Sequence, residues 1–69
     1  MNVIAEVAGK VWKIAAQPGA ALAADDPILI LESMKMEIPV VAPAAGKLLE
    51  LCVKEGDAVD EGDVIAIMG

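Results

Sequence analysis

Short aliphatic runs alternate with turn-forming residues along the whole chain. Gly or Pro recurs every few residues, and no long stretch keeps its apolar side chains on one helical face. Short strands separated by close turns are typical of an all-β sandwich or barrel. The pattern therefore predicts an all-β fold without helices.

The chain repeats itself at a spacing of 37 residues. Residues 3–32 align with residues 40–69 without a gap, and ten of the 30 aligned pairs are identical. The identical pairs include turn and strand residues: Gly9/Gly46, Lys10/Lys47, Gly19/Gly56, Asp26/Asp63 and Ile28/Ile65. Since neither copy could bury its apolar face alone, the duplication predicts a pseudo-twofold sandwich with about four strands in each sheet. We expect residues 1–69 to form one domain.

Both copies predict the same order of elements. After a short extended segment come a longer strand, a very short strand and a closing strand: residues 10–16, near Leu22 and residues 28–32 in the first copy, and residues 47–53, near Val59 and residues 64–68 in the second. Turns are expected at Pro18-Gly19, Asp25-Asp26, Glu55-Gly56 and Gly62-Asp63. The copies differ at Ala20 and Asp25, where the second has Asp57 and Gly62.

The longer strands leave two side-chain arrangements open. Val11 and Ile14 cannot lie on one face of a regular strand. Either a β-bulge intervenes, or Trp12 and Ile14 face the core while Val11 lies at the rim. Trp12, which aligns with a leucine, is interpreted as a packing residue. Cys52 aligns with Ala15 and is interpreted as a small, half-buried strand residue.

The segment between the two copies, residues 33–39, breaks a rule that the other turns obey. Aliphatic strands flank it closely, which predicts a hairpin, and tight hairpins favour Asn, Asp or Gly because φ is positive at the turn. Ser33, Met34, Lys35 and Met36 occupy this turn instead. Broken local rules tend to mark functional sites, and exposed methionines adapt to a partner surface. Lys35 is therefore the candidate functional residue.

Composition argues against several classes of function. Eleven acidic residues against five lysines give a net charge of −6, which opposes binding to nucleic-acid phosphates. The chain has no His and a single Cys, so the usual zinc sets, Ser–His or Cys–His nucleophiles and an internal disulfide are not expected. The acidic residues within 55–63 lack a full calcium-loop pattern and are interpreted as solvated turns. We expect no catalytic residue and no metal site.

Neither a membrane span nor a signal peptide is visible in the sequence. The longest uncharged stretch, residues 14–24, contains Pro18 and Gly19 and is well short of the roughly 20 residues that a span needs. The first residues lack a basic region followed by an apolar run. We therefore expect a cytoplasmic protein.

Residues 32–37, Glu-Ser-Met-Lys-Met-Glu, closely resemble the attachment motif of biotinyl domains, whose centre is Met-Lys-Met. The second copy, from Gly46 to Asp63, resembles the family's repeat, and the resemblance covers essentially the whole chain. Nearest in outline are single-domain biotin/lipoyl attachment proteins and the carrier domains of biotin-dependent carboxylases. The resemblance implies a flattened sandwich of two four-stranded antiparallel sheets with Lys35 at an exposed hairpin tip. The gapless repeat leaves no room for the inserted thumb that some biotinyl domains carry.

The resemblance also implies a function. Lys35 would be covalently biotinylated by a biotin protein ligase that recognises Met34 and Met36, and also Glu32 and Glu37. The domain, not itself an enzyme, would then carry biotin between the biotin carboxylase and carboxyltransferase subunits or domains of a biotin-dependent carboxylase. An ordinary lysine amine is almost wholly protonated at pH 7, so the ligase must remove a proton and supply an activated acyl group.

Two other functions stay open at this point. A lipoyl carrier has the same fold, but lipoyl domains usually place Asp before the lysine and Ala after it, so Met on both sides favours biotin over lipoate. An unmodified sandwich that only binds proteins is the third possibility. For all three we expect a monomer, because no self-complementary surface patch is evident.

Overall fold

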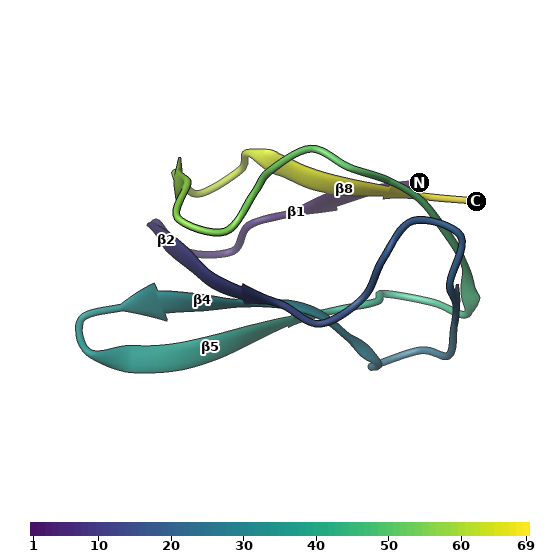
Figure 1. Cartoon of the computed structure of the whole chain (residues 1–69), viewed down its shortest axis with the longest axis horizontal. Coiled ribbons are helices and arrows are strands. Elements are labelled where there is room, and N and C mark those ends of the chain that lie inside the picture. The colour runs from purple at the N-terminus through teal and green to yellow at the C-terminus, as the bar shows by residue number, and fades with distance from the viewer.

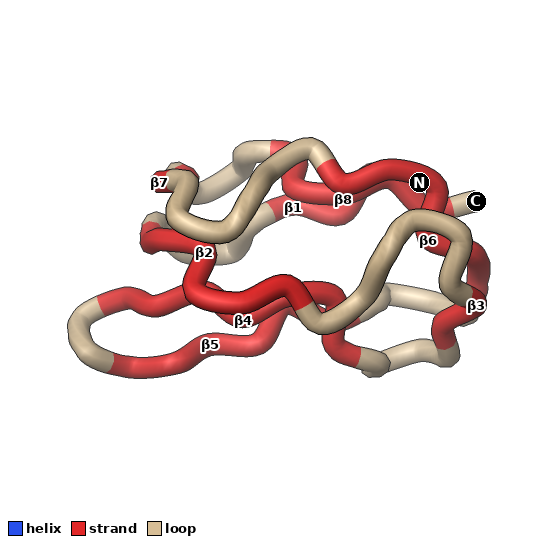
Figure 2. The backbone as a smooth tube through the Cα atoms, viewed as in Figure 1, coloured by secondary structure: helices blue, strands red, loops and turns tan.

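Eight short strands form two four-stranded sheets that lie face to face (Figure 1). The computed structural model describes all residues, 1–69. The strands are β1 (Asn2–Ile4), β2 (Gly9–Ile14), β3 (Ala21–Leu22), β4 (Pro27–Ser33), β5 (Met36–Val41), β6 (Gly46–Leu51), β7 (Ala58–Val59) and β8 (Val64–Met68). Figure 2 shows strands and loops only, so no helix is present that could cross a membrane.

The strand order reflects the sequence duplication. One sheet has the order β1-β8-β6-β3 and the other β5-β4-β2-β7, with every pair antiparallel. Exchanging each strand for its counterpart in the other copy (β1 for β5, β2 for β6, β3 for β7 and β4 for β8) turns one order into the other. The expected sandwich of two four-stranded antiparallel sheets, related by a pseudo-twofold axis, is confirmed.

Four of the turns contain a residue with left-handed backbone conformation. Gly19 and Gly56 have φ of 95° and 93°, and Gly62 has φ of 91°. Asp25 stands where the second copy has Gly62 and adopts φ of 71°, so aspartate fills the left-handed position that glycine fills in the other copy.

The core between the sheets is built from 13 buried residues, all of them hydrophobic. Six have no exposed surface and are large: Ile28, Leu29, Leu31, Leu48, Ile65 and Met68. Ile28 and Ile65 are one of the identical pairs of the repeat, so each copy contributes equivalent side chains to a shared core.

A β-bulge decides how β2 packs. The register with β4 shifts between Val11 and Lys13, which puts Val11 in the core and leaves Trp12 48% exposed. The bulge is thus confirmed, and the alternative with Trp12 facing the core is wrong, as is the interpretation of Trp12 as a packing residue. The prediction for Cys52 is also wrong, because β6 ends at Leu51 and the cysteine is exposed.

Candidate functional site

Residues 33–36 form the tight hairpin between β4 and β5. Ser33 pairs with Met36, which leaves only Met34 and Lys35 in the turn. Their φ angles are 52° and 64°, both positive, as a type I′ hairpin turn requires. Left-handed backbone costs a residue with a side chain roughly 1–2 kcal/mol. The turn therefore holds two strained residues where Asn-Gly would relieve the strain.

The turn lies at one end of the sandwich and faces solvent. Figure 1 shows the β4–β5 loop at the end opposite the two chain termini, which are joined by a 2.7 Å hydrogen bond from the Met1 amino group to the Met68 carbonyl oxygen. Lys35 is exposed, and the flanking Met34 and Met36 are 92% and 64% exposed. The methionines therefore add little to the core and leave two large apolar side chains in water beside an amine.

The two glutamates of the motif lie side by side behind the turn. Glu32 on β4 pairs with Glu37 on β5, and on its other side Glu32 pairs with Lys10 on β2. All three residues are exposed, so they form one row on the outer face of the sheet. Like charges directly opposite each other are unfavourable. This row thus presents two carboxylates to any partner that approaches the hairpin.

Trp12 is a surface residue that sequence reasoning missed. It lines a shallow hollow with Lys10, Val11, Glu32 and Gly56 on the sheet that carries the hairpin. The irregular alternation around Val11 was the signal that could have found it, because a bulge there turns the indole away from the core.

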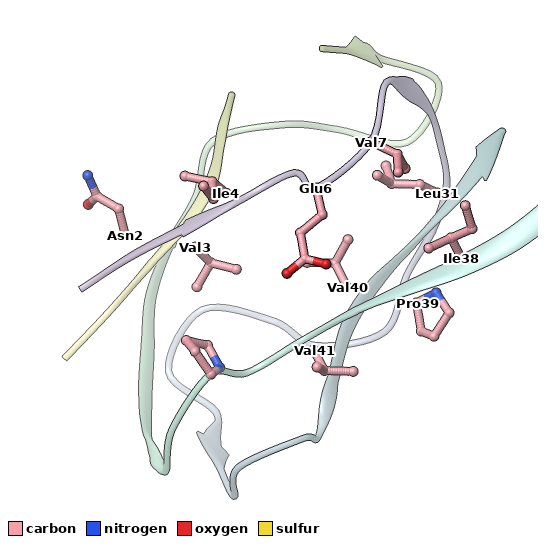
Figure 3. A pocket seen from close by; sticks show the side chains of 11 residues that line it. Asn2, Val3, Ile4, Glu6, Val7, Leu31, Ile38, Pro39, Val40 and Val41 are labelled. Atoms are coloured by element: carbon pink, nitrogen blue, oxygen red, sulfur yellow. The ribbon is translucent and has the colours of Figure 1, made fainter. Parts of the chain in front are cut away.

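An apolar groove runs between the edge strands of the two sheets, away from the turn. Its volume is about 190 Å³. Figure 3 shows the Glu6 side chain reaching among apolar side chains from β1, β4 and β5. Val3 and Ile4 on one side of the groove are the repeat counterparts of Val40 and Val41 on the other side. Equivalent strands of the two copies therefore line the groove. Lys35 does not line it.

The acidic turns have a structural role. Asp26, Asp57 and Asp63 each accept a hydrogen bond from the backbone N–H three residues earlier, at 2.8–2.9 Å. No group of three His, Cys, Asp or Glu side chains could hold a metal ion.

The comparisons of this sequence with known proteins all point to one family. Residues 1–68 match the biotin/lipoyl family, described as "Biotin-requiring enzyme". The chain is 46% identical over 65 residues to the biotin/lipoyl attachment protein of Bacillus subtilis, covering 94% of this chain and 89% of that protein. It is 39% identical over 67 residues to the biotinylated protein TB7.3 homolog of Mycobacterium leprae, covering 97% and 94%.

The fold comparison gives the same result. The crystal structure of Kluyveromyces lactis urea carboxylase superposes with a TM-score of 0.96 at 35% identity, over 100% of this chain. The matched part is 6% of that carboxylase. This chain therefore resembles nearly all of two small proteins and one small part of a large one.

Proposed function

Because this chain belongs to the biotin/lipoyl family of biotin-requiring enzymes, we propose that it is a biotin carboxyl carrier with biotin bound to Lys35. One observation carries the proposal: the lysine stands exposed between two exposed methionines, in the turn of the β4–β5 hairpin. The structure supports a carrier because the candidate residue lies on a projecting tip and not in a cleft.

The tip suits an attachment reaction. The Lys35 Nζ forms a bond to the acyl carbon of activated biotin, the bond to the activating group breaks, and the displaced electron pair leaves with that group. Starting from the charged ammonium, the nitrogen gives up two protons to a base on the ligase or to solvent, one before it attacks and one as the amide forms. Attachment removes one positive charge, so the net charge changes from −6 to −7.

We assign recognition of the tip to its four neighbours. Met34 and Met36 offer flexible apolar contacts that a ligase surface can bury. The paired Glu32 and Glu37 would favour a ligase surface with positive charge. Since φ is positive at Met34 and Lys35, the lysine and the methionines are held in a defined turn.

Biotin supplies group-carrier chemistry when bound. The protein contributes a rigid sandwich, an exposed anchor at Lys35 and a flexible lysine side chain. A short flexible tether can keep its ligand at millimolar effective concentration near a partner site. The carboxylase and carboxyltransferase sites would belong to partner subunits or domains, in keeping with the small share of urea carboxylase that this chain matches.

Intact mass spectrometry tests the proposal. The protein is incubated with a biotin ligase, ATP and biotin, and we expect a mass increase of one biotinyl group. Lys35→Arg should show no increase and keep the wild-type fold by circular dichroism. Lys54→Arg, at another exposed turn lysine, should be labelled like wild type. Full labelling of Lys35→Arg would refute the site.

Lipoate is a second candidate because a relative carries biotin/lipoyl attachment in its name. Lipoate would join the same Lys35 amine. Parallel reactions with a lipoate ligase and lipoic acid, read by the size of the mass increase, separate the two. We expect biotin to be incorporated faster.

A further inference from the structure

Gly9 lies beside the base of the hairpin. On β2, Lys10 pairs with Glu32, so the preceding residue, Gly9, comes alongside Ser33, the last residue of β4 before the turn. On its other side Gly9 pairs with Val59 on β7. The hairpin is therefore supported by β2 up to its last strand pair, Ser33 with Met36.

The contact at Gly9 leaves no room for a side chain. A Cβ atom on Gly9 would lie 2.8 Å from the Glu32 carbonyl oxygen and 3.4 Å from the Ser33 Cβ. The closer neighbour is backbone and cannot rotate away. Gly9 is absent from the residues with positive φ, so space, and not backbone conformation, requires glycine here.

Resting on the proposed modification of Lys35, we infer that Gly9 is a positioning residue for biotinylation. Its missing side chain lets β2 close against Glu32 and Ser33, and this contact sets where the turn presents the lysine. A Cβ at Gly9 pushes the Glu32 carbonyl away, and Glu32 is tied to Glu37 on the other strand of the hairpin. Both strands therefore move with it.

The duplication supplies a matched control. Gly46 is the repeat counterpart of Gly9, and a Cβ there would lie 2.7 Å from the carbonyl oxygen of Gly69, the counterpart of Glu32. The two clashes are alike, but Gly46 lies beside the C-terminus while Gly9 lies beside the Lys35 turn. Ile65→Val, a core substitution in β8, controls for loss of stability alone.

The experiment measures ligase kcat/KM for wild type, Gly9→Ala, Gly46→Ala and Ile65→Val, well below every melting temperature. Active sites tolerate displacements of only about 0.5 Å, so we expect Gly9→Ala to lower kcat/KM about threefold to tenfold. The two controls should stay within about twofold of wild type. Two-dimensional NMR should show amide shift changes at residues 34–36 in Gly9→Ala only. A wild-type rate for Gly9→Ala, or an equal loss in Ile65→Val, would overturn the inference.

Two readouts keep the inference separate from the proposed function. If wild type gains no mass with the ligase, the proposed function fails, and unchanged NMR shifts in the Gly9→Ala turn would still overturn the positioning role. If Gly9→Ala does not fold, ¹⁵N relaxation on wild type decides. Amide order parameters near 0.85 at Ser33 and Met36 support a hairpin held by β2, and values below about 0.6 contradict it.

Discussion

Replacing Ala20 with Asp should stabilise the protein, because one copy of the repeat lacks a hydrogen bond that the other has. In the second copy, the Asp57 carboxylate accepts a 2.9 Å bond from the Lys54 N–H. The counterparts in the first copy are Ala20 and Gln17. The backbone is already in place, because the Ala20 N–H donates to the Gln17 carbonyl at 3.1 Å and the Asp57 N–H to the Lys54 carbonyl at 3.0 Å.

The size of the gain follows from the exposure of the turn. A net intramolecular hydrogen bond contributes about 0.5–1.5 kcal/mol, and an exposed one belongs in the lower half of that range. In a domain of this size, about 1 kcal/mol raises the melting temperature by roughly 4–8 °C. We expect Ala20→Asp to raise the melting temperature by about 2–6 °C. This range allows for a small loss of stability from adding a negative charge to a chain whose net charge is already −6.

Calorimetry and urea unfolding of wild type and four variants test this reasoning. Asp57→Ala should lose about as much stability as Ala20→Asp gains. The double variant, Ala20→Asp with Asp57→Ala, should therefore melt close to the wild-type temperature. Ala20→Asn can accept the same hydrogen bond without the charge and separates the two contributions. If Asp57→Ala is destabilised while both Ala20 variants melt at or below the wild-type temperature, the two turns are not equivalent and the argument fails.

Other predictions concern the tip and the surface around it. The double variant Met34→Asp with Met36→Ala should cut the initial rate of radiolabelled biotin incorporation at least about tenfold, which corresponds to roughly 1.4 kcal/mol. The reason is that an unpaired carboxylate would be buried against the ligase. An unchanged rate would show that preference for biotin is encoded elsewhere. Met34→Gly should raise the melting temperature by relieving positive φ, and unchanged or lower stability would argue against strain in the turn. Trp12 emission should shift on biotinylation, because the exposed indole lies on the outer face of the sheet that carries the tip; identical spectra would show that the bound group does not reach it. Sedimentation at micromolar concentration should give a monomer, and a stable dimer would contradict this.

The repeat made the topology accessible from sequence alone. Equal spacing of turn residues such as Gly19 and Gly56 fixed the connections, and a half-sheet with one apolar face needs its copy for burial. When two such copies align in register, a pseudo-twofold sandwich is one of the few arrangements that bury the apolar faces of both. The hairpin could be placed because the aliphatic strands on both sides of it are joined by so few residues.

Local packing was harder to predict because it depends on register between strands. The bulge in β2 arises where Val11 and Lys13 meet β4, far along the chain, and it alone decides that Val11 is buried and Trp12 exposed. Cys52 was expected to lie within a strand. It is exposed instead, because β6 ends one residue before it, at Leu51. The row of Lys10, Glu32 and Glu37 likewise exists only once three strands are aligned.

The tip is where the symmetry of the fold ends. Residues 33–39 lie between the two copies of the repeat, and only the turn of Met34 and Lys35 places two adjacent residues other than glycine at positive φ. Both copies contribute to the core, through equivalent residues such as Ile28 and Ile65. A core of this kind can carry two strained residues at one end, since left-handed backbone costs roughly 1–2 kcal/mol at each. Glycine at either position would remove the strain, but Lys35→Gly would also remove the amine that we propose as the biotin attachment site, and this proposal gives a reason for a residue other than glycine in the turn.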